Sequence, residues 1–224
     1  MSWVLDTHPH ADHVMASSRL KKQTGAPNAI GVKVKEIAEL WREIYHTPEA
    51  FEPDRDFDRL FVDGDTFKIG SLEVSVMLSV GHTLGSISYI CGDAIFAHDT
   101  FMQPDSGTAR ADFPGGSTEE LWNSLQKILS LPGNTRVFVG HDYGAKNRNE
   151  PAWEATVDEH KAHNVHVKDG TKKEDYIKVR NDRDATLSLP DRMLAALQIN
   201  LRAGQLPDAE ADGDHYLKIP VNKF

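Results

Sequence analysis

The sequence contains a single cysteine, Cys91, among its 224 residues. One cysteine excludes an intrachain disulfide framework, and it also excludes a zinc site built from several cysteines. A metal held by this chain must therefore be bound by histidine and carboxylate side chains. Cys91 lies inside the apolar run 87–95, where we predict a small core residue rather than a nucleophile.

Long hydrophobic runs and a surplus of positive charge are also missing. No apolar stretch approaches the ~18 residues of a membrane span, and the N-terminus shows no basic segment followed by an apolar one. We therefore expect no membrane anchor and a cytoplasmic location. The net charge of −9 disfavours binding to nucleic acid or to an anionic membrane, because both need clustered lysine and arginine. Small molecules are the expected partners.

The chain is long enough to bury one good core, and its composition does not differ between two halves. We predict a single domain over 1–224, in which 165–224 form a helical extension and tail. Helix and strand patterns alternate along the sequence. Helices are expected at 16–24, 34–45, 117–131, 151–164, from a cap at 171, and at 190–203. Strands are expected at 3–7, 28–32, 86–91, 94–97 and 136–139, and one short strand could form at 216–219 in an otherwise irregular tail. The stretches 61–67 and 72–80 are expected to form a β-meander with turns at Gly64 and Gly70, and 46–59 a loop.

One segment near the N-terminus is rich in side chains that bind metals. The sequence THPHADH, at 7–13, follows an apolar run and contains His8, His10, Asp12 and His13. A loop after a strand can turn these groups inward as nitrogen and oxygen ligands of one or two cations. The alternative is a polar surface turn, but HxHxDH would arise by chance in only about a few such sequences per thousand. The segment therefore predicts a metal site.

Three further residues of the same chemistry follow predicted strands: His82 in GHTLGS, Asp99 in FAHDTF and His141 in VGHDY. A lone histidine at a strand end is more often a structural residue than a ligand, but the shared placement of these three favours a metal site. His160 and His163 have an i, i+3 spacing that could also bind a metal. No HExxH pattern accompanies them, so we predict a solvated helix face there.

In this order, HxHxDH, GHT, a lone aspartate and a late histidine resemble the motif set of the metallo-β-lactamase superfamily, over 7–143. The resemblance implies an α/β fold of the αββα sandwich type, with two mixed β-sheets flanked by helices and the metal at one edge. Family members have several strands before the first motif, so the resemblance implies an N-terminally shortened fold with open sheet edges. We expect another copy of the chain to pair there, giving a homo-oligomer.

Within the superfamily, the sequence is most similar to the persulfide dioxygenases, which oxidise glutathione persulfide to sulfite and glutathione. The segment GTARADFPGG at 107–116 looks like the GRTDF segment of that branch, and HDY at 141–143 supplies its tyrosine. Segments NVHV from 164 and YLKIP from 216 resemble the dioxygenase part of bacterial β-lactamase hydrolase-like proteins. His98 is a departure, because the family usually has a glycine before the aspartate.

The dioxygenase resemblance implies that His8, His82 and Asp99 bind one Fe(II), leaving positions open for the persulfide sulfur and O2. Arg110 and Tyr143 would bind glutathione. Four further residues would orient the ligands and hold water: His10, Asp12, His13 and His141. Of these, Asp12 is also assigned a catalytic role, together with the three iron ligands.

The same residues could instead hold two Zn(II) with Asp99 as a bridge, and activate water for attack on a thioester, a lactone or a related ester. The ligand inventory leaves both interpretations open. A third hypothesis is a catalytically idle module that binds a thiol metabolite. Arg110 also has a structural alternative, an ion pair with Asp105 or Asp112, and Tyr143 could serve packing.

Overall fold

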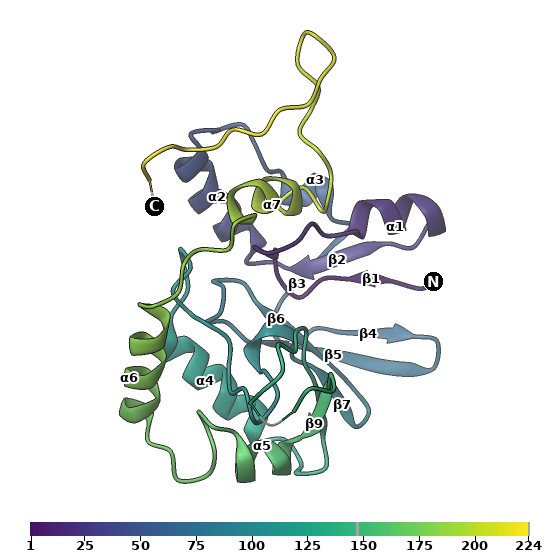
Figure 1. Ribbon diagram of the computed structural model, residues 1–224. Coiled ribbons are helices and arrows are strands. Elements are labelled where there is room, and N and C mark those ends of the chain that lie inside the picture. The colour runs from purple at the N-terminus through teal and green to yellow at the C-terminus, as the bar shows by residue number, and fades with distance from the viewer. Residues whose placement is uncertain (147, 224) are drawn as a thin grey trace. The chain divides into compact units, whose positions relative to one another are not determined.

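The computed structural model describes residues 1–146 and 148–223. Helices and strands alternate, and they belong to two compact units, each with its own sheet (Figure 1). The first unit comprises Met1–Phe61 and the chain from Ser188 onward, and the second comprises Val62–Leu187. The predicted α/β class is confirmed. The single domain over 1–224 stays a prediction, and its last residue, Phe224, lies outside the described residues.

The sheet of the first unit has three strands in the order β1-β2-β3, and both pairs are parallel. Parallel neighbours need a crossover connection, which here contains a helix each time. The elements are β1 (Val4–Leu5), α1 (Ser17–Thr24), β2 (Asn28–Gly31), α2 (Val34–Tyr45) and β3 (Arg59–Phe61). Gly25 ends α1 in the left-handed conformation, with φ 71°, as its sequence position predicted.

The predicted loop over 46–59 contains a short helix, α3 (Pro53–Asp56). Pro53 starts it, because proline lacks the N–H that a first helical position would leave unpaired. Near the C-terminus, α7 (Met193–Asn200) is shorter than the predicted 190–203. The hydroxyl of Tyr45 on α2 donates to the carbonyl oxygen of Leu194 at 2.9 Å, which ties α7 to α2.

The strand predicted at 216–219 is wrong, because the described tail residues after α7 form no strand. The side chain of Gln198 occupies the backbone groups that a neighbouring strand would pair. Its Nε2 donates to the carbonyl oxygen of Lys218 at 3.0 Å, and its Oε1 accepts from the Lys218 N–H at 3.1 Å. The backbone groups of Lys218 are therefore hydrogen-bonded by a side chain on α7 and not by a neighbouring strand.

The sheet of the second unit has six strands in the order β4-β5-β6-β7-β8-β9. It is mixed, because β7 and β8 are parallel while the other neighbours are antiparallel. The strands are β4 (Thr66–Ile69), β5 (Leu72–Leu78), β6 (Ile87–Cys91), β7 (Ala94–Phe96), β8 (Arg136–Phe138) and β9 (Glu154–Thr156).

The stretch 61–67 has the predicted turn at Gly64, but its two sides belong to different sheets. Phe61 ends β3, and Thr66 begins β4 after a turn at Gly64, where φ is 84°. A turn in the left-handed conformation is where glycine is favoured. The antiparallel meander therefore begins at β4.

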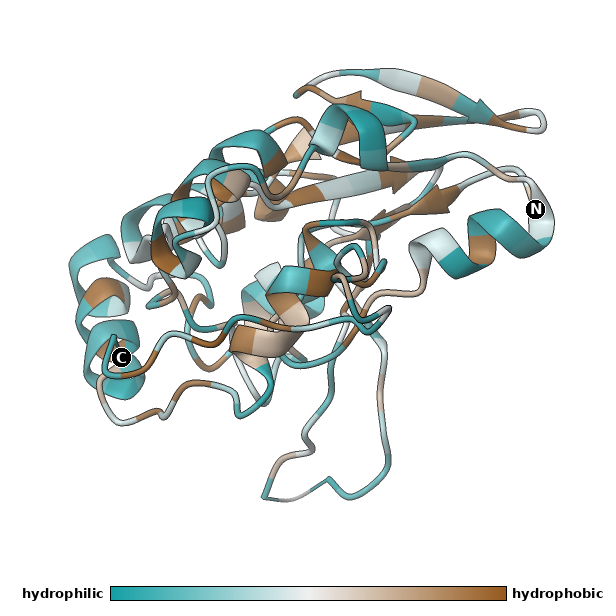
Figure 2. Cartoon of the chain, turned by 90° about the horizontal axis from the view of Figure 1, so that it is seen from above, coloured by the Kyte–Doolittle hydropathy of each residue, from teal (hydrophilic) through white to brown (hydrophobic). Residues whose placement is uncertain are grey.

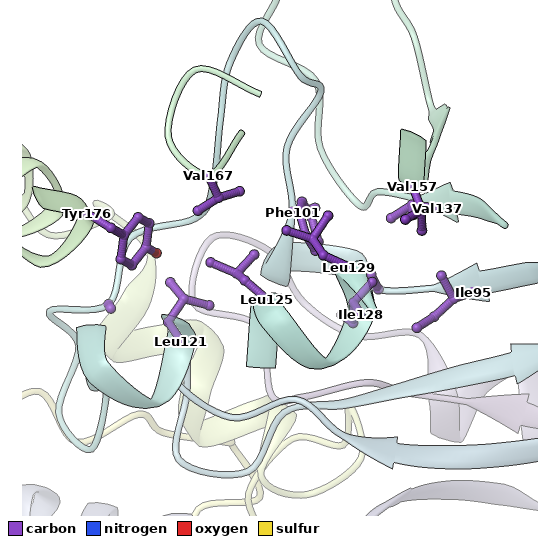
Figure 3. Packing of buried hydrophobic residues seen from close by; sticks show 12 residues of the cluster. Ile95, Phe101, Leu121, Leu125, Ile128, Leu129, Val137, Val157, Val167 and Tyr176 are labelled. Carbon is purple, nitrogen blue, oxygen red and sulfur yellow. The ribbon is translucent and has the colours of Figure 1, made fainter. Parts of the chain in front are cut away.

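The core of the second unit is centred on α4 (Thr118–Leu129), which lies between β7 and β8 in the chain. Ser117 caps this helix, since its side chain accepts from the Glu120 N–H. Buried apolar side chains of α4 pack with Tyr176 at one end of the cluster and with Ile95 and Val137 of the strands at the other (Figure 3).

Two predicted boundaries in the second unit are wrong. The helix predicted over 151–164 begins only after β9, as α5 (Val157–His163), where Thr156 and Glu159 form a capping box. The cap predicted at Thr171 is also wrong. The N-cap of α6 (Lys173–Asp184) is Lys172, which makes no side-chain cap hydrogen bond.

The helices carry both polar and apolar residues, so teal and brown bands alternate along them in Figure 2. In α2, for example, Val34, Ile37 and Trp41 are buried at helical spacing while Glu39 and Glu43 are not. Over the described ranges, no helix is both long enough and apolar enough to cross a membrane.

Candidate metal centre

The loop after β1 gathers imidazoles in the first unit. His8 and His10 are buried, and their ring centroids lie 4.2 Å apart. The rings of His10 and His13 are equally close, at 4.2 Å. One possible ligand atom from each of His10, Asp12 and His13 lies within 4.8 Å of the other two. The structure therefore brings together the residues that the HxHxDH pattern predicted to bind metal.

Asn200, at the end of α7, holds this loop in shape. Its side chain is fully buried, and Nδ2 donates to the carbonyl oxygens of His10 and His13 at 2.7 and 2.8 Å. Its Oδ1 accepts from the Met15 N–H at 2.8 Å. Sequence analysis missed Asn200, because a single asparagine in a helical pattern carries no local signal of a partner far away in the chain.

The second unit gathers two more predicted ligands, His82 and His141, around a third, Asp99, which lies in a short 3-10 helix, η1 (His98–Thr100), after β7. Asp99 Oδ2 is 3.7 Å from His82 Nε2 and 3.5 Å from His141 Nε2. His82 and His141 follow β5 and β8, so strand ends deliver both imidazoles, as predicted.

Both distances are longer than an ordinary hydrogen bond and slightly longer than the separation of two ligands on one ion. Ligand atoms 2.0–2.1 Å from an ion lie roughly 3.0 to 3.4 Å from each other in octahedral and tetrahedral arrangements. The side chains of His82 and Asp99 are only 10% and 7% exposed, so the carboxylate lies in a dry setting between two nitrogen donors. The donor set of two imidazoles and one carboxylate suits Fe(II) or Zn(II).

A hydrogen bond at Nδ1 determines the tautomer of His82. Nδ1 is 2.8 Å from the carbonyl oxygen of Arg110, which can only accept, so Nδ1 must carry the hydrogen. The neutral ring then has its lone pair on Nε2, which faces Asp99. Metal-binding histidines are commonly oriented by a second hydrogen bond of this kind.

The backbone at His98 has the left-handed conformation that suits the glycine expected there from the resemblance. Its φ is 44°, a left-handed conformation that side chains rarely adopt. The imidazole Nδ1 is 2.9 Å from Asp99 Oδ1, so the two oxygens of Asp99 face different imidazoles. Gly140 makes room for this arrangement, because a Cβ on it would overlap the His98 ring.

Arg110 makes one of the two ion pairs considered from the sequence. Its Nε and Nη2 are each 2.7 Å from an oxygen of Asp112, and the guanidinium lies 4.7 Å from the centroid of the Phe113 ring. The alternative pair with Asp105 is wrong, because Asp105 is bound by Arg148. The hydrogen bonds with Asp112 raise the pKa of Arg110. Burial raises the pKa of Asp112, but the bonds from Arg110 outweigh it and the net direction is down.

Tyr143 is 78% exposed, and its ring is stacked on His141 with centroids 5.7 Å apart and planes 11° apart. The residue between them is anchored: the Asp142 carboxylate pairs with Arg148 at 2.5 Å and accepts from the Ala152 N–H at 2.7 Å. Arg148 first, and then the backbone donors, hold the pKa of Asp142 well below its usual range. Ionised Asp142 thus fixes the loop that carries His141 and Tyr143.

The solvated helix face predicted for His160 is wrong. His160 is fully buried, its ring lies 4.5 Å from that of Phe101, and its Nδ1 is 3.1 Å from Asn164 Nδ2. Burial lowers the pKa of His160 to about 4. His163, three residues later, is exposed, as predicted. Helix α5 has only seven residues, too few for the sequence pattern to show which of its faces would be buried.

The comparisons with known proteins agree with this donor chemistry. The chain matches the family model described as "Metallo-beta-lactamase superfamily" over residues 2–141. It is 52% identical over 222 residues to the "Beta-lactamase hydrolase-like protein" of Xylella fastidiosa, a match that covers 99% of this chain and 51% of that protein. The chain therefore spans about half the length of the first curated relatives that it matches.

Two other relatives carry different names. "Glyoxylase B2" of Dictyostelium discoideum is 44% identical over 223 residues, which cover 98% of this chain and 76% of that protein. "Hydroxyacylglutathione hydrolase" of Rhodospirillum rubrum is 33% identical over 146 residues, which cover 64% of this chain and 49% of that protein. Among solved structures, ETHE1 from Myxococcus xanthus is similar with a TM-score of 0.72 and 30% identity, covering 91% of this chain and 78% of that one.

Proposed function

Because the chain belongs to the metallo-beta-lactamase superfamily, we propose that it is a metalloenzyme that oxidises glutathione persulfide to sulfite and glutathione at one Fe(II). The observation that carries this proposal is the likeness to ETHE1 over 91% of the chain, together with the segments at 107–116 and 141–143 that resemble the persulfide dioxygenases. The relative named hydroxyacylglutathione hydrolase supports the coarser statement of a glutathione-related metalloenzyme.

In the proposed site, His8, His82 and Asp99 bind the iron. Ferrous iron, when bound, supplies the redox chemistry and the open positions that O2 and a persulfide need. The protein residues supply orientation: the Arg110 carbonyl holds the tautomer of His82, and His98 holds one oxygen of Asp99. In this proposal His10, Asp12, His13 and His141 would orient the ligands and hold water.

The reaction balances with O2 and water alone. The sulfane sulfur loses four electrons on the way to sulfite, and one O2 takes up those four electrons. Two oxygen atoms of sulfite come from O2 and the third from water, while the S–S bond breaks and glutathione leaves as the thiol. No protein side chain is consumed, so we assign none of them as a nucleophile.

We assign Arg110 and Tyr143 to glutathione. An arginine can form paired hydrogen bonds with a carboxylate, and glutathione carries two carboxylates. The pair with Asp112 holds the guanidinium in place beside Phe113. Tyr143 is 78% exposed next to His141, so a small molecule can reach its ring. A cytoplasmic location is part of the proposal, because the proposed substrate derives from the cytosolic glutathione pool.

The test is metal content together with turnover. Protein produced with iron available should contain about one iron per chain in a triad of two histidines and one carboxylate. Addition of glutathione persulfide should then consume O2 and produce sulfite, as measured with an oxygen electrode and a sulfite assay. A folded, iron-loaded sample that does neither would sink the dioxygenase assignment. Bound metal with no turnover of any substrate would favour a thiol-binding module.

The second candidate is a two-zinc hydrolase of glutathione thioesters, lactones or related esters. The group formed by His10, Asp12 and His13 favours it, since these donors could complete a second metal position. The likeness to hydroxyacylglutathione hydrolase also supports this candidate. Two tightly bound zinc ions per chain, no iron and hydrolysis of a glutathione thioester would establish this candidate instead.

A further inference from the structure

We propose that the buried ion pair Arg180–Asp184 of α6 is a positioning device for His82, acting through the backbone of residues 107–111. The inference rests on His82 being a ligand of the proposed metal site. It does not depend on which metal binds or on which reaction follows.

The ion pair is unusual in its burial. Arg180 Nη2 and Asp184 Oδ1 are 2.7 Å apart, and the two side chains are only 5% and 4% exposed. A buried ion pair contributes little net stability, because removing two charges from water offsets their attraction. Stability alone therefore does not account for this buried ion pair.

The pair holds two points of one backbone segment. Arg180 Nη1 donates to the carbonyl oxygen of Thr108 at 2.9 Å, and Asp184 Oδ2 accepts from the Ala111 N–H at 2.9 Å. Charged groups make stronger hydrogen bonds than neutral ones. The carbonyl of Arg110 lies between these two points, so its direction is set by both.

Other buried groups hold the start of the same segment. Asn164 Nδ2 donates to the carbonyl oxygen of Gly107 at 3.0 Å, and the Thr108 N–H donates to His166 Nδ1 at 3.0 Å. Gly107 is in the left-handed conformation, and a Cβ on it would overlap the His166 ring. Burial and nearby Arg180 lower the pKa of His166 to about 4, so its Nδ1 remains an acceptor at neutral pH.

The segment then orients His82. The Arg110 carbonyl oxygen accepts from His82 Nδ1 at 2.8 Å, which leaves Nε2 as the nitrogen directed at Asp99. The ring of Phe113 stands edge-on to His82, with centroids 5.5 Å apart. A chain of named contacts therefore links α6 to the tautomer of His82: Arg180 and Asp184, then the 108–111 backbone, then the imidazole.

The test replaces the pair with apolar side chains, Arg180→Met together with Asp184→Leu. Replacing both partners leaves no lone buried charge, but it takes these partners from the Thr108 carbonyl and the Ala111 N–H, so some stability should be lost and the fold is checked first. The matched control is Lys178→Met with Asp182→Leu, which removes an exposed pair of the same i, i+4 spacing on the same helix.

Two measurements follow His82 directly. In metal-free protein labelled with ¹⁵N-histidine, NMR reports which ring nitrogen of His82 carries the hydrogen, with His82→Gln as the assignment control. Parent and control should show hydrogen on Nδ1 only, and the double variant should show both tautomers. Titration with Co(II), followed by its visible spectrum, should show affinity lower by about 10-fold to 100-fold in the double variant.

A folded double variant that keeps the Nδ1 tautomer and the parental Co(II) affinity would overturn the proposal, as would equal changes in the control. If the double variant does not fold, Arg180→Lys replaces it, because lysine keeps the charge but lacks the planar fork of donors with which arginine binds Asp184 and Thr108 at once. Arg180→Lys should give the same loss in milder form, and unchanged tautomer and affinity would again overturn the proposal. Glutathione persulfide is absent from both measurements, so failure of the proposed function is a separate result.

Discussion

At the scale of single residues, Asp99 is the group on which both enzymatic proposals depend. It lies between His82 and His141, and its other oxygen is bound by His98. Asp99→Ala should therefore abolish metal binding and activity under either mechanism. We expect His13→Ala to remove a ligand from a two-zinc site but to leave most of the iron in a one-iron site. Elemental analysis checks both, and an equal collapse of iron content in the two variants would contradict the one-iron assignment.

Arg110 has two separable roles, because its side chain pairs with Asp112 while its carbonyl accepts from His82. Arg110→Ala removes the guanidinium and keeps the carbonyl. We expect intact iron content and a weaker use of glutathione persulfide, seen first in KM, by about 1.5 to 3 kcal/mol for one charged hydrogen-bonded pair. Arg110→Lys should restore little of this, because a point charge replaces a fork of donors.

Small persulfides without glutathione carboxylates provide the substrate control for Arg110. Their KM should change little in Arg110→Ala. An equal loss with both substrates, or a loss of iron, would show instead that the Arg110 side chain supports the structure of the 107–116 segment.

At the scale of elements, α5 carries a histidine whose burial makes the stability of the protein depend on pH. His160 has a pKa of about 4 when folded, against about 6.5 in an unfolded chain. As pH falls from about 6.5 to about 4, the unfolded chain takes up a proton while the folded one does not. Stability is therefore lost across this window, by about 3 kcal/mol for a shift of this size, and changes no further below it.

His160→Gln tests this element, because glutamine can accept from Asn164 without titrating. Urea unfolding at pH 7 and at pH 4.5 should show a smaller difference in stability in the variant than in the parent. His163→Gln, on the exposed side of the same helix, should keep the parental difference. If His160→Gln keeps the whole difference too, the acid sensitivity originates elsewhere.

At the scale of the whole molecule, we propose that the chain self-associates. The described sheets end in edge strands, β1 and β3 in one and β4 and β9 in the other. An edge strand presents backbone groups that another chain can pair. Light scattering over a wide concentration range should show a dimer or a larger assembly. A monomer at every concentration would contradict this proposal.

Most local structure could be predicted from the sequence. Helix α2 has the predicted bounds, and Gly25 ends α1 as expected, because apolar spacing and end signals are encoded by neighbouring residues. The prediction failed where a distant side chain decides the outcome. No strand forms at 216–219, where the side chain of Gln198 binds the backbone of Lys218. The helix predicted from residue 151 begins later, because residues 154–156 form β9 and pair with β8.

The sequence by itself determined the donor chemistry of the proposed site, because a chain with a single cysteine must bind a metal through histidine and carboxylate side chains, and the motifs supply both. Only the tertiary structure decided how those donors are held. Asn200 holds the HxHxDH loop, and Arg180 with Asp184 holds the segment that orients His82. These partners are distant in the chain, and a hydrogen bond depends on where two groups meet in space rather than on either local pattern.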